Sequence, residues 1–262
     1  MAGPFKFDSK PYTITIPSTI STALHTLIAR WKLDETEGSS ANDSSGNNLV
    51  GTLVGNPQWQ PSGGKFGGAL KLDGVDDYVE TNYATDLPVW TLAVWVNSPA
   101  VPSSEVPSGP VHRNKNYHIN WNHSFDDFRG TAGVQVGGTW HAASFGDLQA
   151  NTWYHLAATY DGEDFKAYKD GILITNNSTP SGDPDSESTT LKLGRHSLYG
   201  DHFVGTIDDV RIYNYALSQA DIAKIFADKK LGKGVSWTPV LVIVVIAAVA
   251  AGLAIYRKKA TA

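Results

Sequence analysis

The sequence contains no cysteine, and this absence excludes disulfide bonds, zinc sites with thiolate ligands and cysteine nucleophiles. It also lacks an excess of basic residues, because 21 Lys and Arg stand against 26 Asp and Glu and the net charge is −5. Nucleic-acid binding needs a basic surface, so we expect no nucleic-acid partner. For a protein outside the cytoplasm, the absence of cysteine is more typical of a bacterial surface than of an animal one.

Aromatic residues and glycine are plentiful, with 8 Trp, 11 Tyr and 25 Gly, a composition typical of strands and turns. Between residues 27 and 226, β-prone runs alternate with turn signals about every 8–12 residues, which predicts an antiparallel sandwich rather than βαβ units. Gly137-Gly138 and Asp170-Gly171 lie between such runs and predict tight hairpins. One helix is predicted, with Ser218 as its N-cap and Asp221 three residues on.

The C-terminal segment is strongly apolar. Residues 240–255 contain no charged or strongly polar residue, and residues 237–256 would form a helix about 30 Å long, which matches the hydrocarbon core of a bilayer. Trp237 and Tyr256 stand where interfacial aromatic residues are expected. We therefore predict a polar leader or edge extension (1–26), a globular domain (27–230), a linker (231–236), one transmembrane α-helix (237–256) and a basic tail (257–262).

The orientation of this segment depends on its flanking charges. The cationic triplet at residues 257–259 favours a cytoplasmic C-terminus and a domain outside the cell, although three lysines also precede the segment. Residues 1–26 lack the apolar stretch and cleavage site of a signal peptide. Either such a signal is missing or processed, or the protein is tail-anchored with its domain inside the cell, and we expect the first. A sorting signal that is later removed is a third interpretation of the tail.

Several phrases of the sequence stand together in order. They are ARWKLDETEG (29–38), DSSGNNLVGT (43–52), GKFGGALKLDGVDDYVE (64–80), WTLAVWV (90–96), WYHLAATYDG (153–162), YKDG (168–171), LKLGRH (191–196) and GTIDDVRIYNYALS (205–218). Over roughly residues 28–227 the chain resembles the laminin G-like branch of the concanavalin A-like lectin/glucanase superfamily. The resemblance implies an all-β fold, a jelly-roll sandwich of two antiparallel sheets with the first and last strands adjacent.

The resemblance also implies a structural calcium ion between the loop that begins at Asp43 and the strand that carries Asp208. Calcium takes about six to eight oxygen ligands, from carboxylates and from carbonyl groups of turns. We expect Asp43, Asn48 and Asp208 as ligands, with Asp209 as a further candidate. In this interpretation Asp208 points inward and Asp209 faces water. The alternative is that Asp43 caps a turn and that one of the two aspartates points to solvent.

A catalytic role has little support in the sequence. Glycoside hydrolases need two carboxylates on opposite sides of the scissile bond. Glu35 and Glu37 have the spacing of one strand face, but they run into Gly38 and a serine pair, which indicates a loop. No serine-hydrolase, zinc-protease or phosphate-loop motif is present. We expect a non-catalytic protein and keep a glycoside hydrolase as a distant alternative.

Recognition of a glycan or a protein is the function we expect. Carbohydrate sites present exposed aromatic faces to sugar rings and polar groups to hydroxyls. We predict ligand-binding residues in two regions, Trp121 with Trp140 and Tyr199 with His202, although Trp121 and Trp140 are equally well explained as core residues. The expected role is adhesion or carbohydrate binding at a cell surface. The alternative is an envelope protein that self-associates or binds proteins and has no glycan ligand.

Overall fold

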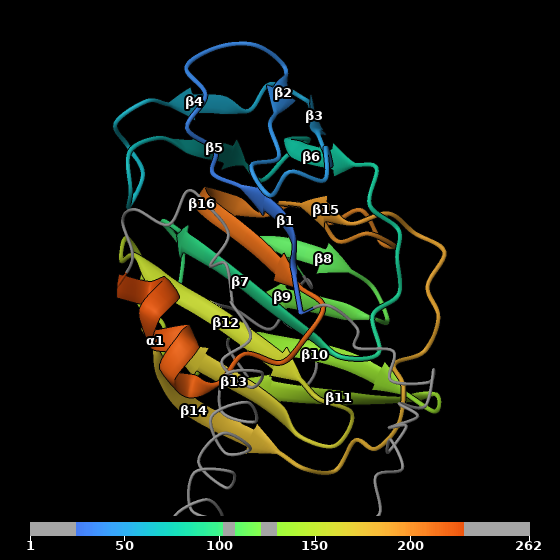
Figure 1. Cartoon of the computed structure of the whole chain (residues 1–262). Coiled ribbons are helices and arrows are strands. Elements are labelled where there is room, and N and C mark those ends of the chain that lie inside the picture. Colours follow the sequence, from blue (N-terminus) through green and yellow to red (C-terminus); the bar gives the residue numbers. More distant parts are fainter. Residues whose placement is uncertain (1–24, 102–107, 122–129, 228–262) are drawn as a thin grey trace, which may run out of the picture.

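The computed structural model describes residues 25–101, 108–121 and 130–227, and it confirms the predicted sandwich of two antiparallel sheets. Within these residues the chain forms two eight-stranded sheets, which face each other across the main core, and one short helix outside them (Figure 1). The helix lies against the sheet that contains the first and last strands.

The first sheet, sheet A, consists of β1 (Leu27–Trp31), β4 (Gln58–Gln60), β5 (Ala69–Asp73), β7 (Trp90–Asn97), β12 (Tyr154–Tyr160), β13 (Phe165–Lys169), β14 (Ile172–Asn177) and β16 (Val204–Tyr213). Its strand order is β14-β13-β12-β7-β16-β5-β4, and β1 pairs with the second half of β16. The expected adjacency of the first and last strands is therefore confirmed.

The second sheet, sheet B, consists of β2 (Ser40–Ala41), β3 (Gly51–Val54), β6 (Tyr78–Thr81), β8 (Val111–Arg113), β9 (Tyr117–Asn120), β10 (Thr131–Val136), β11 (Thr139–Ser144) and β15 (Lys192–Leu193). Its strand order is β11-β10-β9-β8-β15-β6-β3-β2. Both predicted hairpins are present: Gly137 and Gly138 join β10 to β11, and Asp170 and Gly171 join β13 to β14. All four residues have positive φ, 56° and 78° at Gly137 and Gly138 and 52° and 81° at Asp170 and Gly171, as a type I′ turn requires.

Large apolar side chains fill the space between the sheets. The ring of Trp90 lies 5.8 Å from those of Tyr117 and Phe165, so residues of both sheets meet in one cluster. Burying a large apolar side chain contributes about 1.5–3 kcal/mol. This core fixes the two sheets against each other, and with them the side chains on their outer faces.

The helix α1 (Gln219–Ala227) covers part of the outer face of sheet A (Figure 1). Its predicted cap is confirmed, because Ser218 Oγ accepts a hydrogen bond from the Asp221 N–H at 3.2 Å. Buried side chains of the helix form a second apolar cluster with residues of sheet A and the adjoining loop: Ala93, Ala157, Tyr168, Tyr213, Leu217, Ile222 and Ile225.

The centre of β16 contains a β-bulge between Asp208 and Arg211. At this bulge Asp209 takes a positive φ of 48°, and its carboxylate accepts hydrogen bonds from Arg30 Nε at 2.7 Å and Arg211 Nε at 3.0 Å. Burial opposes the charge of Asp209, but the two guanidinium groups hold the pKa of this carboxyl below its ordinary value. Asp209 is 5% exposed, so the expectation that it faces water is wrong. The bulge interrupts the strand's alternation, and both aspartates become buried.

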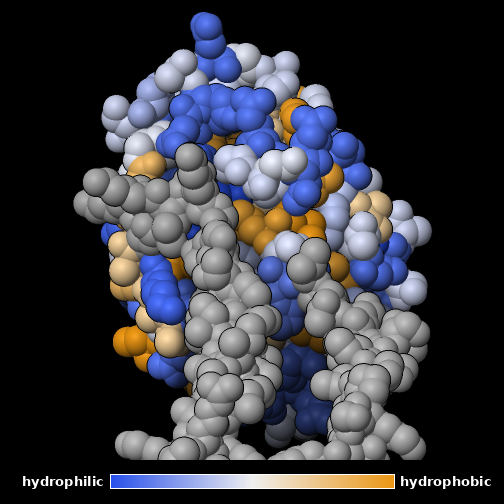
Figure 2. Space-filling view, viewed as in Figure 1, coloured by the Kyte–Doolittle hydropathy of each residue, from blue (hydrophilic) through white to orange (hydrophobic). Residues whose placement is uncertain are grey.

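Several predicted segments lie outside the described residues: the linker, the membrane helix at 237–256, the basic tail and residues 1–24 of the leader. Among the described residues, no helix has the length and hydropathy needed to cross a membrane. Figure 2 shows a hydrophilic surface over the end of the molecule that carries β2 and β4, and hydrophobic residues at the surface in the middle of the view.

The first prediction concerns the contribution of the ion cluster at the bulge to stability. Asp209→Asn keeps the size of the side chain, and asparagine tolerates positive φ. The substitution removes the carboxylate charge that two buried guanidinium groups share. We expect the free energy of unfolding, measured by urea denaturation at pH 7, to fall by about 3–5 kcal/mol.

The matched control for this substitution is Asp164→Asn, which removes a partly exposed ion pair with Lys166. Such pairs contribute about 0–1 kcal/mol. A loss at Asp209 no larger than the loss at Asp164 would contradict the role assigned to the cluster.

Candidate ligand-binding face

The outer face of sheet B carries a row of polar residues. Direct cross-strand pairing places Glu80 beside Lys192, Lys192 beside His112, and His112 beside His118. The neighbouring residues in the chain all point into the main core: Val79, Val111, Ile119 and Leu193. Because side chains alternate along a strand, the polar row points away from the core.

Five aromatic rings form a continuous series across this face. We call them the ring series, in the order Trp140, His118, His112, His196 and Tyr199, and their successive ring centroids are 5.5, 4.6, 3.7 and 4.8 Å apart. The three histidines are buried, whereas Trp140 is 49% and Tyr199 is 70% exposed. Two exposed rings therefore mark the two ends of a buried polar series.

A glycine on β10 makes room for the ring series. Gly133 pairs directly with His118, and a Cβ at Gly133 would lie 2.0 Å from His118 Nε2. The other ring nitrogen of His118, Nδ1, lies 2.9 Å from the carbonyl oxygen of Asn114. These contacts hold the imidazole over β10, next to Trp140.

The loop between β15 and β16 carries the other end of the series. Ser197 Oγ lies 3.0 Å from His112 Nδ1 and accepts a hydrogen bond from the Asn114 N–H at 2.9 Å. Within the loop, His196 Nδ1 accepts a hydrogen bond from the Tyr199 N–H at 3.1 Å. The loop is thus attached to sheet B, and the exposed ring of Tyr199 has a fixed support.

Two buried polar atoms on the same face have no hydrogen-bond partner among the described residues, Asn120 Oδ1 and Thr131 Oγ1. The two residues are direct cross-strand partners, and Asn120 follows His118 by two positions, so it shares the same face. An unsatisfied buried polar group costs about 1–3 kcal/mol. This face therefore keeps hydrogen-bonding capacity that the described residues do not use.

The structure brings three of the four predicted ligand residues to this side of the molecule. Trp140 and Tyr199 end the ring series, and His202 is half-buried at the end of the loop that carries Tyr199. Trp121 is different, because it is 1% exposed and its ring packs against Phe203. The ring of Trp121 therefore lies in the core, which is the alternative interpretation given for it.

None of the three histidines of the ring series was among the predicted ligand residues, although His118 and His196 lie close in sequence to Trp121 and Tyr199. They lie at no regular spacing along the chain, and only strand pairing brings them together. One local signal was present: His112 follows Val111, and His118 precedes Ile119, in short β-prone runs. A polar residue that alternates with apolar ones in this way is expected on the outer face of a sheet.

Asp43, a predicted calcium ligand, has both carboxylate oxygens occupied within its own loop. Oδ1 accepts hydrogen bonds from the N–H groups of Arg30 and Ser45 at 2.9 and 2.8 Å, and Oδ2 accepts one from the Leu49 N–H at 3.0 Å. Burial opposes the charge of Asp43, but these backbone donors hold its pKa below the ordinary value. Asn48 is exposed in the same loop. Asp43 therefore caps this loop, which is the alternative interpretation.

Asp208 is buried at a different place, where its Oδ2 accepts a hydrogen bond from the Phe66 N–H at 2.9 Å. Burial, together with the charges of Asp209 and Asp34, raises the pKa of Asp208 to about 7. Among the described residues, the carboxylates of Asp43, Asp208 and Asp209 are not gathered within 4.8 Å of one another. These three carboxylates therefore do not meet at one point, and calcium binding stays a prediction.

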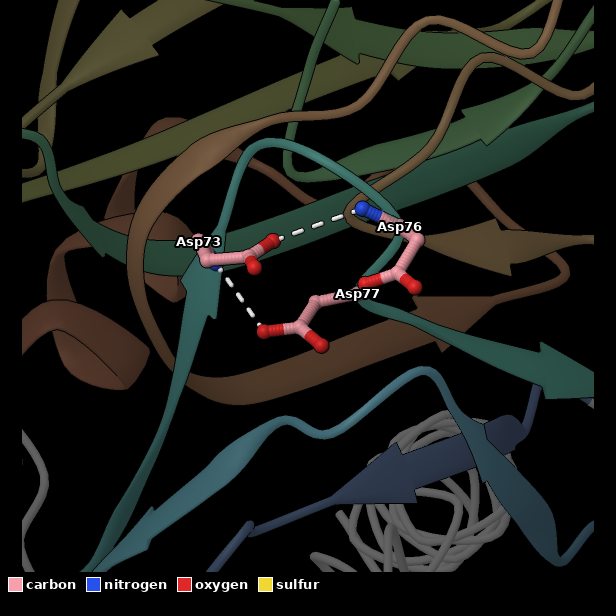
Figure 3. A group of neighbouring side chains, drawn as sticks. All are labelled: Asp73, Asp76 and Asp77. Carbon is pink, nitrogen blue, oxygen red and sulfur yellow. Dashed lines mark hydrogen bonds between the residues drawn. The ribbon is translucent and has the colours of Figure 1, made fainter.

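One group of three carboxylates does lie within 4.8 Å in the described part of the chain: Asp73, Asp76 and Asp77, at the turn between β5 and β6 (Figure 3). Asp77 Oδ2 accepts a hydrogen bond from the Asp73 N–H at 3.1 Å, and its Oδ1 accepts one from the Asn56 N–H at 2.6 Å. Asp73 Oδ1 accepts another from the Val75 N–H at 2.8 Å. These bonds explain the group as part of the turn, and we assign no ion to it.

The two glutamates considered for catalysis lie in the loop beyond the end of β1 rather than on a strand. Glu35 Oε1 accepts a hydrogen bond from the Asn42 N–H at 2.7 Å, and Glu37 is exposed. Because neither residue lies on a strand, the alternation that would place both carboxylates on one strand face does not apply.

The second prediction concerns stability and follows from the burial of Trp121 and the exposure of Trp140. Trp121→Ala removes a buried ring and should lower the free energy of unfolding by about 3–5 kcal/mol, whereas Trp140→Ala should change it by less than about 1 kcal/mol. Urea denaturation of both variants checks this difference. Equal losses would show that Trp140 is a core residue as well.

Residues 73–223 match a laminin G-like family described as Concanavalin A-like lectin/glucanases superfamily. No curated protein matches the sequence. A similar solved structure is Domain 4 of AbnA, a GH43 extracellular arabinanase from Geobacillus stearothermophilus, in complex with arabinotriose. It is 20% identical with a TM-score of 0.63, over 78% of this chain and 99% of that chain.

Two further similar structures are binding domains of larger proteins. The binding domain of Paraclostridial Mosquitocidal Protein 1 has a TM-score of 0.59 at 15% identity, over 77% of this chain and 52% of that chain. The botulinum neurotoxin serotype D binding domain has a TM-score of 0.57 at 15% identity, over 77% and 51%. This chain thus spans about half of each of these domains, and at these identities the likeness shows the fold. The family match covers more than half of the 262 residues, so the chain belongs to this laminin G-like family of the Concanavalin A-like lectin/glucanases superfamily.

Proposed function

We propose that this protein is a recognition module whose outer face of sheet B binds a glycan. The observation that carries the proposal is the pair of exposed rings, Trp140 and Tyr199, at the ends of a polar ring series. Exposed aromatic faces stack on sugar rings, and nearby polar groups bind sugar hydroxyls. Support also comes from the similar structures, of which one is in complex with arabinotriose and two are binding domains.

The same face favours binding over cleavage. Hydrolysis of a glycosidic bond uses two carboxyl groups about 5–9.5 Å apart. The ring series contains no carboxylate, and the nearby Glu80 is bound by Lys192 and Thr190. We therefore assign this face a role in holding sugars and no role in hydrolysis.

We further propose that residues 237–256 anchor the protein in a membrane and that the domain is displayed at a bacterial cell surface. The proposal rests on the apolar composition of the segment and on the cationic triplet that follows it. A recognition face held near a membrane would bind glycans outside the cell.

Self-association is a second candidate function, and one observation favours it. The edge strand β14 of sheet A exposes two isoleucines, Ile172 at 62% and Ile174 at 42%. Edge strands with exposed apolar residues can pair with another chain. A monomer at high concentration, measured by sedimentation, would remove this candidate.

Binding to a panel of purified glycans tests the main proposal. We expect the full chain, held in a mild detergent, to bind a subset of the panel saturably. Trp140→Ala and Tyr199→Ala should each weaken binding by about tenfold or more, because aromatic contacts dominate such sites.

The matched control is Ile172→Ala, which removes an exposed apolar side chain from sheet A. We expect this variant to bind as the unchanged protein does. Binding that survives both ring substitutions would place the ligand on another surface.

Calcium binding also stays a proposal, and Asp208 is its best-placed residue. A buried carboxylate with a raised pKa gains most from a cation, and Asp34 is close enough to act on its charge. The carboxylate of Asp209 does not fit this role, because Arg30 and Arg211 already neutralise it.

Thermal unfolding in excess calcium and in chelator tests this proposal. At a hundred times its Kd, the ion should add about 2.7 kcal/mol to the stability of the full chain. Asp208→Asn should abolish this gain, and Asp76→Asn should keep it. The same unfolding temperature in calcium and in chelator would reject the calcium proposal.

A further inference from the structure

We propose that the glycan bound at this face carries a carboxylate and that the guanidinium group of Arg195 recognises it. The inference rests on the proposed function and adds the charge class of the ligand. It concerns the end of the ring series where Tyr199 is exposed and where His202 pairs with Arg195.

Arg195 differs from the other arginines that the structure describes. Arg30 and Arg211 bind Asp209, and Arg113 binds Asp86. Arg195 has no ion pair and no hydrogen bond within the described residues, and its Nε is a buried atom without a partner. Burying part of a guanidinium group without a counter-charge costs free energy. Arg195 is half-buried, so binding of a ligand that supplies a negative charge would be favourable.

The side chain of Arg195 is nevertheless held in place. Its guanidinium carbon lies 4.9 Å from the ring centroid of Tyr78, which is a cation–π contact. Gly200 also lies close to this group, because a Cβ at Gly200 would lie 2.9 Å from Nη2, and Gly200 has a φ of 84°. Glycine at this position therefore lets the loop close against the guanidinium group. The donor fork is positioned before any ligand arrives, which lowers the entropic cost of binding.

The surroundings of Arg195 favour one carboxylate over a polyanion. Burial and the charge of Arg195 lower the pKa of His202, so this imidazole is neutral at pH 7 and adds no second cation. Asp73, Asp76 and Asp201 act electrostatically on His202, which places negative charge around the same loop. A ligand with many charges would be repelled, whereas a single carboxylate can reach the guanidinium group.

The chemistry of the half-buried guanidinium group and of the exposed Tyr199 ring fits an acidic sugar. A guanidinium group binds a carboxylate through two parallel N–H···O bonds. Because both groups are planar, this geometry favours a carboxylate over a neutral hydroxyl. The exposed ring of Tyr199, next to Gly200 in the chain, offers a face on which a sugar ring can stack. A uronic-acid type of unit presents both features, a carboxylate and a pyranose face.

Oligosaccharides of uronic acids and their methyl esters test the inference, because esterification removes the charge and keeps the sugar. The full chain is measured in mild detergent by titration calorimetry. We expect the acids to bind about tenfold or more tightly than their esters. Arg195→Gln should remove this preference, and Lys71→Gln, which changes a cation on sheet A, should keep it.

Two results would overturn the inference. Equal affinity of the unchanged protein for acids and esters would do so without any variant, and so would an unchanged preference in Arg195→Gln. If neutral glycans bind and need Trp140, the proposed function stands while the charge assignment fails. If no glycan binds at all, both proposals fail.

Discussion

The buried contact of Asp209 with Arg30 and Arg211 is the constraint on which the arrangement of sheet A depends. It joins β1 to β16, the first and last strands, at the centre of the sheet. The backbone N–H of Arg30 also binds Asp43, so the loop that follows β1 is attached at the same place. Two arginines around one carboxylate compensate for its burial, whereas removal of one partner would leave an uncompensated charge. The cluster therefore determines where the two ends of the domain meet.

The bulge at Asp209 also shows which features of the fold can be predicted from the sequence. The two hairpins and the cap at Ser218 depend on residues close together in the chain, and all three were predictable. The direction of Asp209 was not, because strand alternation assumes a regular strand. A bulge adds one residue and turns the next side chain, and its partner Arg30 lies 179 residues away. Such distant pairing leaves no local pattern.

The two outer faces of the sandwich have different environments. On sheet A, α1 covers His155 and Trp95, and Phe226 stacks on Trp95 at 5.4 Å. Burial there, together with the charge of Arg211, lowers the pKa of His155 to about 3, so this histidine stays neutral and structural. On sheet B the histidines form a series that ends in the exposed rings of Trp140 and Tyr199. Sheet B therefore offers the face that the helix does not cover.

The candidate site was predictable only where local sequence determines exposure. Tyr199 stands in a short loop beside Gly200, and such residues are usually exposed, as it is. Trp121 and Trp140 both lie in β-prone regions, and their opposite burial depends on where each strand runs in the sheet.

The unpaired charge of Arg195 has a different origin, because it becomes visible only when every neighbour has been placed. A fold that pairs three of its four described arginines with carboxylates has the means to pair the fourth. Asp73, Asp76 and Asp201 are near the same loop, yet none of them binds Arg195. Stability alone would favour such a pair or a neutral side chain at this position. A binding partner that supplies the counter-charge accounts for an arginine that the described residues leave unneutralised.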